Sequence, residues 1–208
     1  MGIMKKFFNN TRKPEGKLGR IMVNGMNGGA HTVLAEWGVS HISVKTDADD
    51  LDCGCGGGAN VARLLKMMPD GKVTGLDYSE VSVAKSKEVN AKEIQSGRCQ
   101  IIQGNVAELP FAADSFDVVT AFETIYFWPG LDNCFKEIYK VLKSGGVFMI
   151  TNESDGQNAG SLKWTTIVEG MTVYTGEQIK SALLNAGFAD VKIDDQVDKD
   201  RICVCAYK

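Results

Sequence analysis

The sequence predicts an α/β fold in which a mostly parallel β-sheet lies between two layers of helices. From Gly54 onward, short apolar runs typical of strands alternate with helical patterns, which indicates a parallel sheet covered on both faces. The last two strand-like runs, residues 191–194 and 202–207, are joined by a short polar loop. A connection of that length permits only antiparallel pairing, so the chain is expected to close with one antiparallel strand.

A glycine-rich turn opens the alternating region. Residues 51–60 read Leu-Asp-Cys-Gly-Cys-Gly-Gly-Gly-Ala-Asn, with glycine at 54, 56 and 58 and an acid, Asp52, two positions earlier. Glycines this dense indicate a close backbone approach, or a turn in which a side chain would clash. A strand, a glycine turn and a helix N-terminus together form the usual cradle for a nucleotide. The run therefore predicts a nucleotide-like ligand.

The elements that follow the turn can be read in order. The glycine turn is followed by a helix with an apolar stripe, which Pro69 ends. A short strand is then expected at 73–77, with Asp77 at its end. Ser79 is placed to cap a helix that runs to about residue 90. Further strands are expected at 100–105 and 116–122, the second almost wholly apolar, as suits a strand covered on both faces. The stripe of the first helix consists of Val61, Leu64, Leu65 and Met68.

The second half continues the alternation. A helix is expected over residues 131–142, and Ser144-Gly145-Gly146 is expected to stop it, with a glycine in a left-handed cap. A fifth strand is predicted at 147–150. Thr175 and Gln178 have the spacing of a capping box for a helix that ends near Gly187.

The first 45 residues do not follow the repeat. Two helical patterns, around Leu18 to Met26 and Val33 to Trp37, are separated by glycines. We expect a helical cap over the sheet edge, which divides the chain into a cap or arm (1–45) and a ligand-binding domain (46–208). The basic residues between Lys5 and Arg20 are interpreted as a solvated arm rather than a phosphate-binding one.

Composition narrows the function. The net charge of −3 argues against a general nucleic-acid binder. No apolar stretch approaches the ~20 residues that span a bilayer, and the first residues do not resemble a secretory signal, so a cytoplasmic location without a membrane partner is expected. The six cysteines form no C-x-x-C pair and there are two histidines, so no metal site is expected and the thiols are predicted to be buried and reduced.

Together these features resemble the class I S-adenosylmethionine-dependent methyltransferases of the small-molecule type, over about residues 46–208. The motifs are Asp52-x-Gly54-x-Gly56-x-Gly58, Asp77 at the end of the second strand, Gly104-Asn105-Val106 before Leu109-Pro110-Phe111, Phe116-Asp117-Val118-Val119, and Leu142-Lys143-Ser144-Gly145-Gly146. The resemblance implies a Rossmann-like three-layer sandwich with a seven-stranded sheet and an antiparallel last strand.

The resemblance also implies S-adenosylmethionine as cofactor. The turn at Gly54, Cys55 and Gly56 would approach its methionine part, and Asp52 would accept from the ammonium. Asp77 would accept from the ribose hydroxyls. The adenine would be contacted by the remaining predicted residues, Tyr78, Gly104, Asn105 and Val106.

The acceptor site is expected in the segment after the fourth strand, residues 123–129. Tyr126 and Trp128 are candidates to bind a small-molecule acceptor, and Glu123 and Tyr126 are the candidate catalytic residues, although contact with the cofactor is the favoured role of Glu123. In-line methyl transfer needs mainly alignment, with a base only if the acceptor must lose a proton. The segment lacks the Pro-Pro-Tyr signature of enzymes that methylate nucleic-acid amines. His31 and His41 are expected to be structural.

Two residues depart from the family pattern, and two other functions stay open. Asp50 shares a strand face with Asp52 where an apolar residue is expected; either the strand starts later, or Asp50 finds donors, or it is protonated. Asn105 stands where the family often has Asp. Gly54 to Ala59 also fits G-x-G-x-x-A, so an NAD(P)-dependent oxidoreductase is an alternative, as is a non-catalytic S-adenosylmethionine-binding protein. The chain is expected to be a monomer or homodimer.

Overall fold

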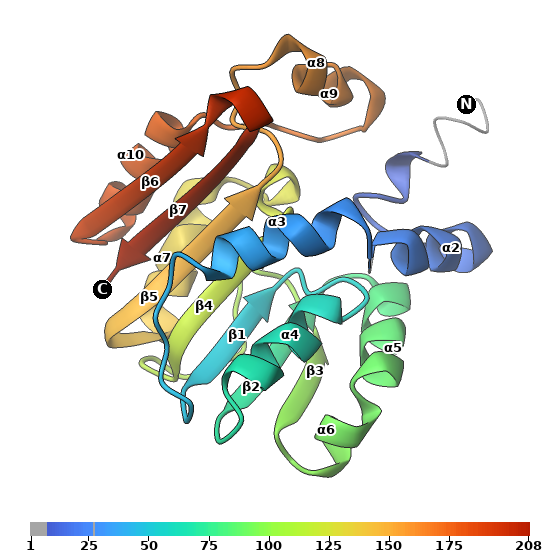
Figure 1. The fold of residues 1–208 in the computed structure, drawn as a ribbon, viewed down its shortest axis with the longest axis vertical. Helices are drawn as coiled ribbons and strands as arrows, with labels where there is room; N and C mark the ends of the chain where they lie inside the picture. The colour runs from blue at the N-terminus through green and yellow to red at the C-terminus, as the bar shows by residue number, and fades with distance from the viewer. Residues whose placement is uncertain (1–7, 27) are drawn as a thin grey trace.

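A computed structural model describes residues 8–26 and 28–208 and confirms the predicted sheet. Seven strands form one sheet in the order β3-β2-β1-β4-β5-β7-β6, in which β7 runs in the opposite direction to the other six (Figure 1). The strands are β1 (Asp49–Cys53), β2 (Lys72–Asp77), β3 (Cys99–Gln103), β4 (Phe116–Phe122), β5 (Leu142–Asn152), β6 (Asp190–Gln196) and β7 (Arg201–Tyr207).

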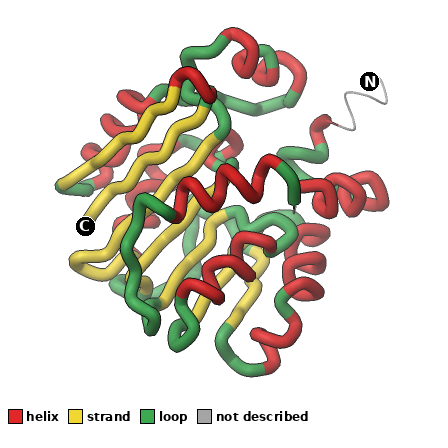
Figure 2. The backbone as a smooth tube through the Cα atoms, in the orientation of Figure 1, coloured by secondary structure: helices red, strands yellow, loops and turns green. Residues whose placement is uncertain are grey.

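Helices cover both faces of the sheet and give it three layers (Figure 2). On one face, α7 (Leu131–Val141) and α10 (Gly176–Ala186) bury a core that includes Phe135 and Phe148. The other face carries α3 (Ala30–Val39), α4 (Ala59–Met67) and α5 (Glu80–Val89), over a second core that includes Leu64 and Met149. Each face of the sheet is therefore covered by an apolar cluster, as expected for a sheet between two helical layers.

The predicted helix boundaries that rest on local hydrogen bonds are confirmed. The Ser79 hydroxyl accepts from the Ser82 N–H at 3.3 Å and caps α5. Thr175 and Gln178 form the expected capping box of α10, which ends at Gly187 with φ of 112°. The structure adds short helices that have too few residues to show an apolar stripe: α6 (Ala91–Gln95), α8 (Ala159–Leu162) and α9 (Trp164–Ile167).

The predicted glycine cap of α7 is wrong. The helix ends at Val141, and Leu142 is already extended and begins β5. The register between β4 and β5 jumps from Phe116 opposite Leu142 to Val118 opposite Val147, so residues 143–146 form a bulge against one residue of β4. Gly145 takes a φ of +79° in this bulge. The glycines therefore shape the start of a strand.

The predicted position of the N-terminal cap is also wrong, because α3 lies on the face of the sheet and not at its edge. The close approach is made possible by Gly38: a Cβ there would lie 2.2 Å from the Thr151 hydroxyl oxygen on β5. The Cys203 thiol on β7 donates to the Gly38 carbonyl. The other N-terminal helix, α2 (Gly16–Met26), packs against α5. Lys5 and Lys6 of the predicted basic arm lie outside the described residues.

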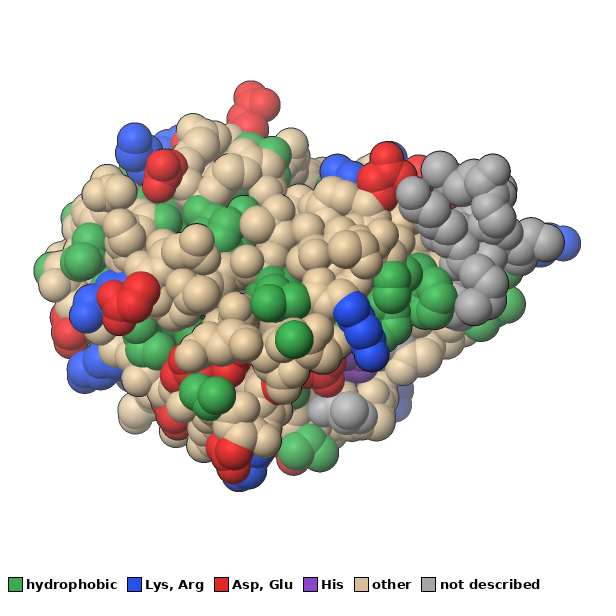
Figure 3. All heavy atoms as spheres, turned by 90° about the horizontal axis from the view of Figure 1, so that it is seen from above, with side chains coloured by type: hydrophobic (Ala, Val, Ile, Leu, Met, Phe, Trp, Pro, Cys, Tyr) green, Lys and Arg blue, Asp and Glu red, His purple; other side chains and the backbone are tan. Residues whose placement is uncertain are grey.

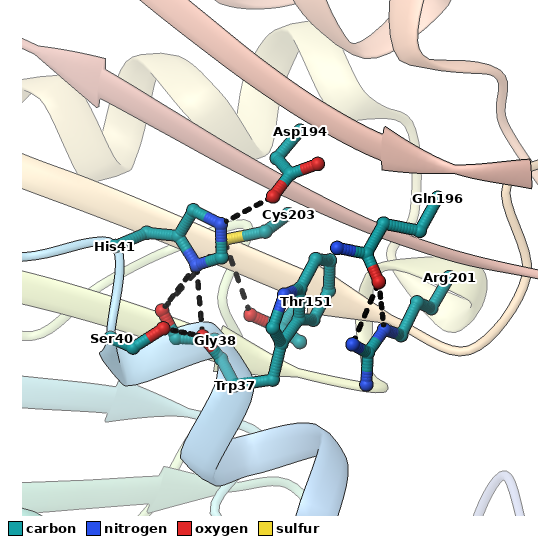
Figure 4. A network of polar contacts seen from close by, with 9 residues as sticks. All are labelled: Trp37, Gly38, Ser40, His41, Thr151, Asp194, Gln196, Arg201 and Cys203. Atoms are coloured by element: carbon teal, nitrogen blue, oxygen red, sulfur yellow. Dashed lines mark hydrogen bonds and ion pairs between the residues drawn. The ribbon is translucent and has the colours of Figure 1, made fainter. Parts of the chain in front are cut away.

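The C-terminal end of α3 is fastened to the last two strands (Figure 4). His41 Nε2 lies 2.8 Å from a carboxylate oxygen of Asp194, and His41 Nδ1 bonds the Trp37 and Gly38 carbonyls. The Arg201 guanidinium stacks 4.2 Å from the centre of the Trp37 ring. His41 is therefore a structural residue, as predicted.

The described surface carries mixed charges (Figure 3), and the cysteines lie in the interior. Acidic and basic side chains are interspersed on the face that Figure 3 shows. No helix among the described residues is long and apolar enough to cross a membrane. All six cysteines are buried and free, and within the described part of the chain no group of His, Cys, Asp and Glu side chains is placed to hold a metal ion.

Candidate active site

A cavity of about 350 Å³ opens at the carboxyl ends of β1, β2 and β4. It brings together most of the residues that the sequence predicts for the cofactor and acceptor. The predicted residues in its wall are Gly54, Cys55, Gly56, Asp77, Tyr78, Gly104, Asn105, Val106, Glu123 and Trp128. Asp52 and Tyr126 are the two predicted residues that are not in this wall.

The glycine turn is folded tightly against β2 and α5. The N–H groups of Gly54 and Cys55 both donate to the Leu76 carbonyl, at 2.7 and 3.0 Å. Gly58 takes a φ of +83° at the start of α4, and a Cβ there would lie 2.4 Å from the Ser86 hydroxyl oxygen. In contrast, a Cβ at Gly56 would meet no atom within 4 Å. The backbone at Gly56 therefore lies directly against open space.

Asp77 joins the second strand to this turn. One of its carboxylate oxygens accepts from the Gly56 N–H at 3.0 Å, and the other accepts from the Ser79 N–H at 2.8 Å. Burial raises the pKa of Asp77, and the bonds from Ser79 and Gly56 oppose that rise. Each carboxylate oxygen retains acceptor capacity at the cavity wall, because each has two lone pairs. Asp77 is therefore held in place to accept from a ligand hydroxyl pair.

The adenine-contacting segment predicted at 104–106 lies beside Asp77. The Gly104 N–H donates to the Asp77 carbonyl at 3.0 Å, which fixes the segment on the end of β2. The side-chain amide oxygen Oδ1 of Asn105 accepts from the Ala107 N–H at 3.0 Å and keeps one lone pair for a ligand. Tyr78 is 40% exposed, and its hydroxyl donates to the Arg12 carbonyl.

Asp50 and Asp52 lie beneath the cavity, inside the sheet. The Thr120 hydroxyl donates to one oxygen of Asp52 at 3.2 Å, and burial raises the pKa of Asp52 to about 7. Asp50 is fully buried, and neither of its oxygens has a partner among the described residues. Burial and the neighbouring Asp52 raise the pKa of Asp50 well above its usual value. β1 begins at Asp49, so Asp50 lies within the strand, and a contact with the Thr120 hydroxyl opposes the rise in the pKa of Asp50. Burial without a close hydrogen-bond partner favours the protonated option.

The segment after β4 supplies the opposite wall. Glu123 takes a φ of +60° there, which is unusual for a residue with a side chain. The indole N–H of Trp128 donates to the Thr124 hydroxyl at 2.8 Å, and the Trp128 ring stacks on Phe148. Tyr126 is buried, and its hydroxyl bonds to Glu123 and Ser154 instead of reaching the cavity.

Several wall residues were not predicted. They come from segments whose position depends on tertiary contacts, the N-terminal strap (residues 8–15) and helices α2 to α4. The strap was interpreted as solvated, yet Pro14 is buried in it. His31 on α3 also lines the cavity. The further wall residues include Thr11, Arg12, Val23, Thr32, Leu34, Asn60 and Arg63.

Comparisons with known proteins agree with this geometry. A family model described as a methyltransferase domain matches residues 45–197. The sterol 24-C-methyltransferase of Neurospora crassa is 28% identical over 179 residues, which cover 77% of this chain and 45% of that protein. The chain spans less than half the length of the curated relatives it matches.

Solved structures show the same fold. N-methyltransferase 2 of Haemonchus contortus, solved with phosphomonomethylethanolamine and S-adenosylhomocysteine, superposes with a TM-score of 0.79 at 18% identity, covering all of this chain and 60% of that one. The cyclase SpnF superposes with a TM-score of 0.70 at 25% identity, covering 81% of this chain and 60% of the cyclase.

Proposed function

The chain belongs to the class I S-adenosylmethionine-dependent methyltransferase family, and from that premise we propose that it transfers a methyl group from S-adenosylmethionine to a small-molecule acceptor. One observation carries the proposal. A single cavity is lined by the glycine turn, by Asp77, by the 104–106 segment and by the residues after β4. The first three of these would bind a nucleoside-containing methyl donor, and the residues after β4 would bind the acceptor, so one cavity can hold both reactants.

The wall fits the cofactor at three places. The open space against Gly56 leaves room for the methionine part, because no Cβ fills it. Asp77 offers two oxygens to the ribose hydroxyls, and Asn105 keeps a lone pair for the base. When bound, S-adenosylmethionine supplies a methyl group that is already activated on a sulfonium. Asp52 is not in the wall, so it has no direct contact in this proposal.

The residues of the wall contribute to catalysis by holding the two reactants in a fixed alignment. Trp128 is held by its bond to Thr124 and by the stacked Phe148 ring, so its face is a fixed part of the wall. Alignment of two reactants in a closed site is a large contribution to the rate of a bimolecular displacement. The strap contributes Thr11, Arg12 and Pro14 to the cavity wall.

The first test is isothermal titration calorimetry of the full chain with S-adenosylhomocysteine and, separately, with NAD. We expect S-adenosylhomocysteine to bind and NAD not to bind. Binding of NAD without S-adenosylhomocysteine would overturn the proposal in favour of an oxidoreductase.

The second test separates an enzyme from a binding protein. The chain is incubated with methyl-labelled S-adenosylmethionine and a panel of small-molecule metabolites, and both labelled product and S-adenosylhomocysteine are measured. We expect at least one acceptor to be labelled in step with S-adenosylhomocysteine release. Cofactor binding without transfer to any acceptor would support the non-catalytic alternative.

The oligomeric state is a separate question, and light scattering on the same preparation would distinguish a monomer from a homodimer.

A further inference from the structure

Glu123 has a backbone conformation that the surrounding structure must enforce. It directly follows β4, takes a φ of +60° and lines the cavity. Its N–H donates to the Thr151 carbonyl on β5 at 2.9 Å, which holds the residue in this conformation. A non-glycine residue in the left-handed region is strained, and such strain is concentrated at functional sites. The conformation therefore directs attention to the Glu123 carboxyl group.

The Glu123 carboxyl group is oriented by its neighbours through one oxygen. Glu123 Oε1 accepts from the Tyr126 hydroxyl at 3.2 Å and from the Glu153 N–H. The Tyr126 hydroxyl in turn accepts from the Ser154 N–H at 3.0 Å, so its single proton is directed to Glu123. No residue in the described part of the chain donates to Glu123 Oε2. That oxygen is the one left for a ligand.

The titratable groups that face Glu123 come from three segments of the chain. They are the Glu153 carboxylate after β5, Asp200 at the turn before β7, and the Tyr126 hydroxyl in η1 (Ile125–Phe127). Burial and the charge of Glu153 raise the pKa of Glu123 to about 8, while the bonds from the Glu153 N–H and Tyr126 oppose the rise. A carboxyl group whose pKa is raised toward the working pH is suited to proton transfer.

We propose that Glu123 accepts the proton that the methyl acceptor loses, and that Tyr126 is the positioning residue that presents it. The inference rests on the proposed function and names the acceptor class: a small molecule whose methylated atom carries an ionisable O–H or N–H. The acceptor lone pair forms the bond to the methyl carbon, the electron pair of the broken carbon–sulfur bond passes to the sulfonium, and the acceptor proton passes to Glu123 Oε2.

The test that needs no acceptor is a carbon-13 NMR titration of glutamate carboxyl groups in the full chain with S-adenosylhomocysteine bound. We expect one glutamate to titrate far above the others and to vanish in Glu123→Gln. Tyr126→Phe removes a donor to the carboxylate, so the titration moves to higher pH; Glu153→Gln removes a facing charge, so it moves to lower pH. Tyr139→Phe in α7, where the Tyr139 ring packs on Phe188, is the matched control and leaves it unchanged.

The kinetic test uses the acceptor that the metabolite panel identifies. We expect Glu123→Gln to lower kcat by roughly a hundredfold, within the usual range for a general base, and to bind S-adenosylhomocysteine within about twofold of the unsubstituted protein. Tyr126→Phe should move the acid limb of the kcat pH profile in the same direction as the NMR titration.

Three outcomes would overturn the proposal while leaving methyl transfer intact. They are a Glu123 carboxyl that titrates like an exposed glutamate, a Glu123→Gln variant with unchanged kcat, and an acceptor whose methylated atom carries no proton. Failure to bind S-adenosylhomocysteine would instead count against the proposed function. The two failures are therefore distinguishable.

Discussion

Asp50 and Asp52 lie on the same face of β1, and both side chains are excluded from solvent. Val73 of β2 and Val118 of β4 flank Asp50 in the neighbouring strands, so its surroundings are apolar. A carboxyl group in such a position keeps its proton, because the ionised form would be desolvated without a partner. The centre of the sheet therefore contains a carboxyl group whose pKa is raised by burial and by the neighbouring Asp52.

This relationship predicts how stability depends on pH. The folded pKa of Asp50 is raised, so its contribution is fully present below the ordinary aspartate pKa near 3.8 and is lost as the pH rises toward the folded value. Asp50→Val removes the penalty and should raise the free energy of unfolding by about 1–3 kcal/mol at pH 8, and by less at pH 4. Urea denaturation at both pH values measures it. Asp49→Asn, a half-exposed neighbour, is the control, and an equal effect of Asp50→Val at both pH values would contradict the protonated state.

Asp77 should be required for cofactor binding. Asp77→Ala removes both the acceptors offered to the ribose and the bond that fixes the Gly56 N–H. We expect the affinity for S-adenosylhomocysteine to fall at least tenfold, which is about 1.4 kcal/mol. Calorimetry measures the change, with Asp70→Ala in an exposed turn as the control. An unchanged dissociation constant would remove Asp77 from the site.

The strap should open more often without the Tyr78 hydroxyl. Tyr78→Phe loses the bond to the Arg12 carbonyl, and a hydrogen bond worth about 1 kcal/mol corresponds to roughly fivefold more of the open state. Trypsin cleavage after Arg12, followed by mass spectrometry, should accelerate by about that factor. Cleavage at the rate of the unsubstituted protein would show that the other strap contacts, such as the bond between Ser79 and the Pro14 carbonyl, suffice.

The bond between His41 and Asp194 should stabilise the fold most under mildly acidic conditions. Burial alone would lower the pKa of His41, but the hydrogen bonds to Asp194, Trp37 and Gly38 outweigh it, so the pKa is raised. A raised histidine pKa gives stability that is present below pH 6.5 and is lost as the pH rises through the folded value. His41→Gln should therefore destabilise more at pH 6 than at pH 9. Asp194→Asn and the double variant complete a mutant cycle, and a pH-independent coupling would refute the ion pair.

Two glycines with the same backbone strain should differ in their tolerance of a methyl group. Gly58 and Gly97 both have φ near +80°, but a Cβ would overlap Ser86 only at Gly58 and would meet nothing within 4 Å at Gly97. Gly97→Ala should cost about 1 kcal/mol from its conformation, and Gly58→Ala clearly more, because overpacking adds 1–3 kcal/mol. Thermal denaturation compares the stability lost by the two variants. Equal losses would mean that α5 moves at Ser86 to accommodate the added methyl group without further cost.

Local signals in the sequence predicted those features that local chemistry determines. Ser79, the Thr175–Gln178 pair and Gly187 act within their own turns, and the structure has each helix boundary where these residues indicate it. The cofactor wall was predictable for the same reason, because the glycine turn and Asp77 both lie at strand ends that a parallel sheet brings together.

What the sequence did not predict depends on contacts between distant residues. The position of α3 is determined by the fit of Gly38 against Thr151, more than a hundred residues away. Asp52 and Tyr126 were expected at the cavity, but the pleat of β1 and the turn after β4 direct them into the interior. The 143–146 bulge appears only when β4 and β5 are paired.

The place of β7 in the sheet has a consequence for the order of folding. Residues 201–207 pair with β5 on one side and β6 on the other, so β6 has no ladder partner until this later segment is available. During synthesis, β6 would wait as an unpaired segment while β1 to β5 can already assemble. Completion of the sheet therefore joins the local β6–β7 hairpin to the distant strand β5, and this non-local pairing is expected to form later than the hairpin itself.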